Sequence, residues 1–149
     1  MALPTTLPFA AITVLLESQV TPNTFNAPCG MKERSFTLTK ETGETTVPDC
    51  DDEAAATWVE RDAISRSAAI AGQGVVSRES LPQWRNAYAL EGPIRVRVNF
   101  AGTNAQGGGF WLGSYHLTNL EYGATKGERC TISVEMQSTG PVVFTPAAP

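Results

Sequence analysis

Apolar and polar residues alternate one by one along several short segments, and this alternation constrains the fold of the chain most. In residues 94–100, Ile94 and Val98 belong to an apolar row that alternates with Arg and Asn. Residues 35–39 repeat the pattern, and so do residues 129–137, where the inward row begins at Cys130. A period of two is that of a strand with one buried and one solvated face. The alternation therefore predicts antiparallel β-structure.

The remaining segments add further strands and one helix. The other predicted strands are residues 9–17, 63–76 and 110–122, with a short edge strand at 142–144. Arg66 interrupts one face of residues 63–76, which predicts a bulge or an edge position. Helical spacing joins Leu81, Trp84, Ala87 and Tyr88, after a cap at Ser77 or Ser80 and before Gly92 and Pro93. The prediction is a mainly β domain of about six or seven strands with one α-helix.

The length of 149 residues suits one domain, residues 1–149. Within it, residues 41–62 contain eight acidic residues and one basic residue, a net charge of −7. The rest of the chain has ten basic and seven acidic residues, a net charge of +3. A structureless segment of this length is uncommon in a compact domain and is usually functional or disordered until it is bound. We therefore expect an extended acidic arm, in the form of a long loop, at about residues 41–62.

Composition argues against several classes of protein. The net charge of −4 and the lack of a Lys/Arg cluster disfavour tight binding to nucleic acid. The three cysteines form no CxxC pair, which predicts neither a disulfide framework nor a zinc site and favours a reducing compartment. Residues 7–16 are apolar, but Pro8 interrupts them and no Lys or Arg precedes them, so we interpret them as a strand rather than a signal or membrane segment.

Candidate catalytic and metal-binding residues are few. The acidic cluster at residues 49–53 lacks the glycine and final glutamate of a calcium hand, so a solvated or interface loop is favoured over a cation site. His116 is the single histidine, and Ser114 beside it lies in no nucleophile-elbow pattern. We therefore predict no catalytic residue, no metal and no cofactor. Trp58 closes the acidic arm and is a candidate anchor on a partner.

The order of these features resembles a known family. A strand at residues 35–40 leads into the acidic segment Glu-Thr-Gly-Glu-Thr-Thr-Val-Pro-Asp-Cys-Asp-Asp-Glu, which closes in Trp-Val-Glu-Arg-Asp at residues 58–62. A small-residue strand with Ala-Ile-Ala-Gly-Gln-Gly, a Trp-bearing helix and a strand pair ending Glu-Met-Gln-Ser-Thr-Gly follow. Over residues 9–144 this pattern is similar to the major tail tube proteins of long non-contractile phage tails and of gene-transfer-agent particles.

The resemblance implies two packed antiparallel β-sheets with one flanking helix. It further implies hexameric rings that stack into a tail tube, through which double-stranded DNA leaves the particle. The strands around the arm and the strands at residues 110–137 would form two hairpins of an inner barrel. Polar residues that do not grip DNA suit a lumen; the candidates are Thr37, Thr39, Ser65, Ser67, Thr131, Ser133 and Glu135. An ordinary solvated sheet face explains the same alternation equally well. Arg129 and Arg66 are expected at subunit seams.

The arm, in the same layout, would contact neighbouring subunits or rings. Its candidate contact residues are Glu41, Glu44, Pro48, Asp49, Asp51, Asp52, Glu53 and Trp58. The expected partners are other copies of the chain, tail tip or baseplate, tape measure and tail terminator proteins, and transiently passing DNA. The resemblance implies a location in the virion tail after synthesis in the bacterial host cytoplasm, without membrane insertion.

Two other functions remain open at this point. A soluble carbohydrate- or cation-binding β-sandwich would use the aromatic residues and the acidic segment. A small hydrolase would need two Asp or Glu residues close together in a cleft, whereas most of the acids lie in one arm. A self-assembling structural subunit accounts for more features than either.

Overall fold

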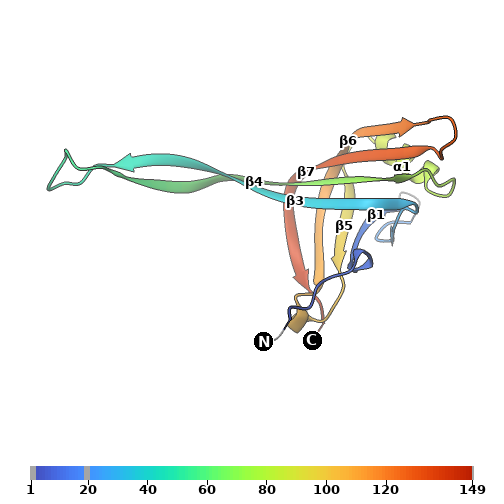
Figure 1. The fold of residues 1–149 in the computed structure, drawn as a ribbon, viewed down its shortest axis with the longest axis horizontal. Coiled ribbons are helices and arrows are strands. Elements are labelled where there is room, and N and C mark those ends of the chain that lie inside the picture. The colour runs from blue at the N-terminus through green and yellow to red at the C-terminus, as the bar shows by residue number, and fades with distance from the viewer. Residues whose placement is uncertain (1–2, 19–20, 149) are drawn as a thin grey trace.

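The fold is built on a seven-stranded antiparallel sheet, described for residues 3–18 and 21–148 of a computed structural model (Figure 1). The strand order is β2-β1-β5-β6-β7-β4-β3. The strands are β1 (Ile12–Glu17), β2 (Phe25–Asn26), β3 (Met31–Val47), β4 (Trp58–Val75), β5 (Ile94–Phe100), β6 (Gly109–Gly123) and β7 (Thr131–Pro146). One α-helix, α1 (Leu81–Ala89), and two short 3-10 turns, η1 (Phe9–Ala11) and η2 (Asn104–Gln106), complete the elements. The mainly β prediction with one helix is confirmed.

The two longest strands of the body, β6 and β7, belong to both halves of the sheet. β5 pairs with residues 109–115 of β6, whereas β4 pairs with residues 131–137 of β7. The β6–β7 ladder shifts register at Leu112/Ser114, within the first of these regions, and again at Leu117/Asn119, opposite the second. Such irregularities bend strands. The expectation of two separate sheets is therefore corrected: the two halves are hydrogen-bonded into one sheet through β6 and β7.

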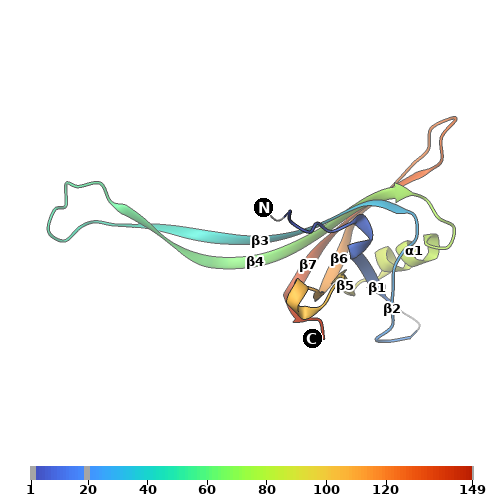
Figure 2. The same ribbon diagram turned by 60° about the horizontal axis from the view of Figure 1, so that its bottom comes forward.

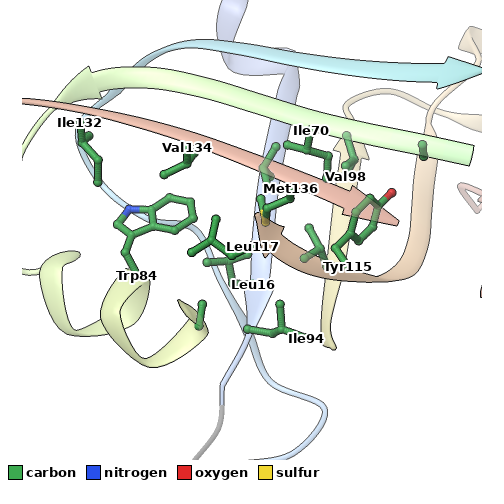
Figure 3. Packing of buried hydrophobic residues seen from close by; sticks show 14 residues of the cluster. Leu16, Ile70, Trp84, Ile94, Val98, Tyr115, Leu117, Ile132, Val134 and Met136 are labelled. Atoms are coloured by element: carbon green, nitrogen blue, oxygen red, sulfur yellow. The ribbon is translucent and has the colours of Figure 1, made fainter. Parts of the chain in front are cut away.

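The core lies between these two halves and α1 (Figure 3). Trp84 points from α1 toward the strands and is almost completely buried (Figure 3). Leu16 and Tyr115 come from one half of the sheet, and Val134 and Met136 from the other. Burying large side chains of this kind contributes about 1.5–3 kcal/mol each. The core therefore depends on both halves facing each other.

The helix begins after Ser80, one of the two expected caps, and ends at Ala89, three residues before Gly92. Ser80 occupies the N-cap position and Pro82 the first turn, but the Ser80 hydroxyl donates to the Ser77 carbonyl rather than capping the helix. Trp84 and Ala87 are buried. Tyr88, which helical spacing places on the same apolar side, is exposed and lies with Leu81 and Arg85 beside Leu120 and Tyr122 of β6.

The acidic segment is where the loop prediction fails. Residues 41–47 belong to β3 and residues 58–62 to β4, and they pair rung by rung from Glu41 opposite Ser65 to Val47 opposite Trp58. Only residues 48–57 connect the strands. β-branched residues such as Thr46 and Val59 favour strands, and the ladder pairs the backbone groups that a loop would leave to solvent. Figures 1 and 2 show this hairpin projecting far from the body. We call residues 41–63 the arm.

Three further boundaries differ from the sequence prediction. Residues 142–144 are not a separate edge strand but part of β7, paired with β6. Cys130 precedes β7 and is exposed, so it does not join the inward row of Ile132 and Val134. Residues 9–11 form η1 rather than the beginning of a strand.

The expected bulge in β4 is present. Glu41 pairs with Ser65 and Thr42 with Ala63, which leaves Ile64 as the extra residue. This irregularity lies at the root of the arm, two residues from Arg66. The interruption of the apolar face by Arg66 in the sequence therefore corresponds to a departure from regular pairing in the structure.

Candidate functional site

All seven candidate lumen residues lie on one face of the sheet, the face turned away from the core. In the half formed by β3, β4, β7 and β6, residues directly opposite each other share a face. One rung joins Thr37, Ala69, Gln137 and His116, and the next joins Ser35, Ala71, Glu135 and Asn119. Neighbouring rungs place the other candidates on the same side, namely Thr39, Ser65, Ser67, Thr131 and Ser133. We call this surface the polar face.

The charged residues that are paired on the polar face are all negative. Its paired residues include the four carboxylates of Glu33, Glu41, Glu121 and Glu135, and none of them is Lys or Arg. Lys32 lies at the end of this face, at the irregularity beside Met31, in a hollow that Glu33 and Glu121 also line. The polar face therefore presents hydroxyl, amide and carboxylate groups, and its paired residues carry no cation.

The two arginines expected at seams lie off this face. Arg66 pairs with Lys40 on the opposite side of the hairpin, and Arg129 lies in the turn before β7. Their assignment to subunit seams remains a prediction.

Two strand edges flank the polar face. β3 is the last strand of the sheet, and residues 116–123 of β6 extend beyond the pairing of β6 with β5. Within residues 3–18 and 21–148, neither edge has a neighbouring strand. Long open edges are sites for pairing with another chain.

The arm and the bulge at its root present exposed apolar groups beside acidic residues. Trp58 is 87% exposed and lies opposite Val47 at the end of the ladder, and Ile64 is 71% exposed at the bulge. An indole with this exposure contributes little to the fold of one chain, because its hydrophobic area stays in water. The role of Trp58 as an anchor on a partner remains a prediction.

The structure separates the candidate acids of the arm into ladder and loop residues. Glu41 accepts a hydrogen bond from the Ser65 hydroxyl at 3.4 Å, and Glu44 pairs with Arg61 at 3.0 Å. Pro48, Asp51 and Glu53 lie in the exposed loop 48–57, together with two acids that close turns within it. Those two are Asp49, which accepts from the Asp51 amide at 2.9 Å, and Asp52, which accepts from the Ala54 amide at 3.2 Å.

A groove at the root of the arm was missed by the sequence analysis. It has a volume of about 630 Å³ and lies where β3 and β4 leave the C-terminal part of β7. Its walls are Leu38, Thr39, Lys40, Arg66, Ser67, Trp111, Gly140, Pro141, Val142 and Val143. The groove depends on tertiary pairing. In the sequence, only the isolated cations Lys40 and Arg66, among small polar residues, point to it. We call it the root groove.

No arrangement typical of catalysis or metal binding appears in the part of the chain that the structure describes. No group of three or more His, Cys, Asp or Glu residues converges there to hold a metal ion. Burial raises the pKa of Tyr115 to about 12, and this hydroxyl lies inside the core rather than in a cleft. The Ser77 hydroxyl lowers the pKa of Glu79 at an exposed turn. No helix among the described elements has the length and hydropathy to cross a membrane.

Comparisons with known proteins give a consistent result. Residues 9–144 match the family of phage tail tube proteins. No curated protein sequence matches the chain. Among solved structures, the fold is similar to a chain in the tail of an empty gene-transfer-agent particle, with a TM-score of 0.79 and 18% identity over 94% of this chain and 99% of that one.

Two other solved structures show the same fold. A chain in the virion of a native gene-transfer-agent particle aligns with a TM-score of 0.75 and 19% identity, over 94% of this chain and 99% of that one. A chain of the SPP1 tail tube aligns with a TM-score of 0.68 and 13% identity, over 97% of this chain and 81% of that one. At this identity the alignments show the fold, whereas the family follows from the match over residues 9–144. The chain therefore belongs to the phage tail tube protein family, a family of structural proteins of the tail.

Proposed function

We propose that this protein assembles into hexameric rings that stack as a tail tube and form the conduit for DNA ejection. The observation that carries the proposal is the pair of open edges on the half formed by β6, β7, β4 and β3. Because four strands alternate in direction, β3 runs opposite to β6. Rotation about a ring axis keeps strand directions, so β3 of one copy meets β6 of the next as an antiparallel neighbour. This head-to-tail contact closes into a ring.

The polar face supports the assignment of a lumen. In the ring it lines the channel with Thr, Ser, Gln and Glu side chains and no paired Lys or Arg. Each basic contact with phosphate adds an attraction that must be broken again. A lumen of hydroxyl and carboxylate groups therefore lets the duplex pass without binding it tightly.

The arm contacts neighbouring copies in this assembly. Its length, the acids of loop 48–57 and the exposed Trp58 suit a segment whose partner is another chain. Tail tip or baseplate and tail terminator proteins cap the two ends of the tube, and a tape measure protein occupies it during assembly. The expected location is the virion tail, after synthesis in the host cytoplasm.

Disulfide cross-linking between the two edges tests the ring. In a background with Cys29, Cys50 and Cys130 changed to Ser, we would introduce Ser35→Cys on β3 and Asn119→Cys on β6. Within one chain these positions share a rung but are separated by β4 and β7, hence by about 14 Å, which is too far for a disulfide. We expect a ladder of covalent oligomers that ends at the hexamer.

Two controls make this experiment decisive. Thr37→Cys and Thr39→Cys, in place of Ser35→Cys, scan the register of the new ladder. Glu91→Cys, in place of Asn119→Cys, puts the second thiol in the exposed turn after α1, where no ladder is expected. Monomers in every register, together with the absence of rings or tubes in negative-stain electron microscopy at high concentration, would contradict the proposal.

A further inference from the structure

Two like charges face each other at the root of the arm. Lys40 on β3 and Arg66 on β4 are directly opposite in the ladder, on the side away from the polar face. Like charges in this arrangement destabilise a strand pair. The ion pairs found among residues 3–18 and 21–148 are Arg61–Glu44 and Arg95–Glu17, so no carboxylate of the described chain neutralises Lys40 or Arg66.

The same two cations border the apolar root groove. Leu38 is 51% exposed and Val143 is 58% exposed, and Trp111 and Val142 line the groove beside them. None of the lining residues is acidic. The groove thus combines exposed hydrophobic area with two unpaired positive charges, which indicates an occupant that is both apolar and anionic.

One segment of this chain has that chemistry. Loop 48–57 contains Asp49, Asp51, Asp52 and Glu53 and no basic residue, and it is followed at once by Trp58. The loop cannot reach the groove of its own chain, because the ladder from Lys40 to Val47 holds them apart over seven residue steps, or about 23 Å. The complementary surfaces therefore lie on separate copies.

We propose that the root groove of one copy binds loop 48–57 and Trp58 of a second copy. Trp58 fills the apolar part beside Leu38 and Val143, and the loop carboxylates neutralise Lys40 and Arg66. The inference rests on the proposed function, because it specifies the partner surface of the arm. Each copy carries one loop and one groove at different places, so this contact is heterologous and continues from copy to copy.

Cross-linking between two distinguishable chains tests the contact directly. The first chain carries Cys29→Ser and Cys130→Ser and keeps Cys50 in the loop, where the thiol is exposed. The second chain carries all three cysteines as Ser and adds Val143→Cys in the groove. A short bis-maleimide should join the two chains. A second chain with Thr37→Cys on the polar face, in place of Val143→Cys, is the matched control and should react about tenfold less.

Charge reversal then identifies the contacts. Lys40→Glu with Arg66→Glu in the second chain should lower the cross-linking yield about tenfold, which corresponds to about 1.4 kcal/mol. Asp49→Lys with Asp51→Lys in the first chain should restore it. Arg78→Glu with Arg85→Glu changes the net charge equally at two exposed positions before and within α1, and should leave the yield unchanged.

The outcomes separate this inference from the ring proposal. Equal cross-linking at Val143→Cys and Thr37→Cys, or no rescue by the reversed loop, would overturn the docking of the loop even if hexamers form. Loss of double-stranded DNA binding by the Lys40/Arg66 variant, with cross-linking unchanged, would assign the groove to phosphate instead. If the cross-linking yield changes with the charge reversals but no rings form, the docking of the loop would be supported and only the ring proposal would be contradicted.

Discussion

The body and the arm of this protein are parts of the same sheet but are stabilised in different ways. In the body, Trp84, Tyr115 and Val96 have at most 1% of their surface exposed. In the arm, residues 41–63 include no buried side chain. The arm has a backbone ladder, one exposed ion pair and the Glu41–Ser65 hydrogen bond. A two-stranded ribbon of this kind has little stability of its own in water.

The two regions find their stabilising contacts in different places. The body buries its apolar area within one chain, whereas Trp58, Ile64 and Leu38 leave theirs available to another molecule. The most exposed of them, Trp58, lies on the projecting hairpin and is therefore a candidate contact with another molecule. Mutations should therefore separate the two regions: body variants affect folding and arm variants affect assembly.

Replacing a tryptophan in each region gives the largest expected contrast. Trp84→Ala should lower the free energy of unfolding by about 3–5 kcal/mol, because it leaves a cavity between α1 and the sheet. Trp58→Ala should change it by less than about 0.5 kcal/mol, because the indole is already solvated. Urea denaturation of the isolated subunit measures both values.

Assembly completes this comparison. Trp58→Ala should fold normally yet show fewer stacked particles in electron microscopy at the same protein concentration. A large loss of stability in Trp58→Ala would mean that the arm packs on its own body, which would contradict the division described above.

Alkaline pH should weaken the body through Tyr115. Burial raises the pKa of this phenol from 10.0 to about 12, and its hydroxyl has no hydrogen-bond partner in the described part of the chain. Above pH 10 the unfolded chain loses the proton while the folded chain keeps it, so stability falls until about pH 12. The expected loss is about 2–3 kcal/mol.

A Tyr115→Phe variant isolates this effect from the titration of other groups. Its unfolding free energy should fall less steeply between pH 10 and pH 12 than that of the wild type, as measured by denaturant titrations at each pH. Parallel pH profiles for the two proteins would show that Tyr115 does not titrate on unfolding.

Two ion pairs provide the smallest contrast. In the body, Arg95 donates hydrogen bonds to Glu17 at 2.8 Å and to Asn23 at 2.9 Å. On the exposed arm, Arg61 forms an ion pair with Glu44. Arg95→Met should cost about 1 kcal/mol and Arg61→Met about 0.3 kcal/mol, because exposed pairs are screened by water and salt. Thermal unfolding at low and high salt checks the order, and a larger loss for Arg61→Met would reverse the assignment of the stable region.

Much of the sheet could be predicted from local patterns. The period of two in residues 94–100 and the small-residue strand with its bulge near Arg66 are local properties, and they correspond to β5 and β4. The common face of Thr37, Ser67 and Ser133 also followed from alternation. The charge of the acidic arm predicts its position, but a loop is the wrong structure, because its β-branched residues favour the paired strands that are observed.

The alternation of residues, the presence of one helix after Ser77 or Ser80, and the concentration of acids in one segment follow from the sequence alone, because they depend on neighbours in the chain. Only the tertiary structure decided that β6 and β7 join both halves, that two edges stay open, and that Lys40 faces Arg66 above an apolar groove. These features depend on strand register between segments distant in sequence. A shift of one residue in register would turn every side chain to the other face.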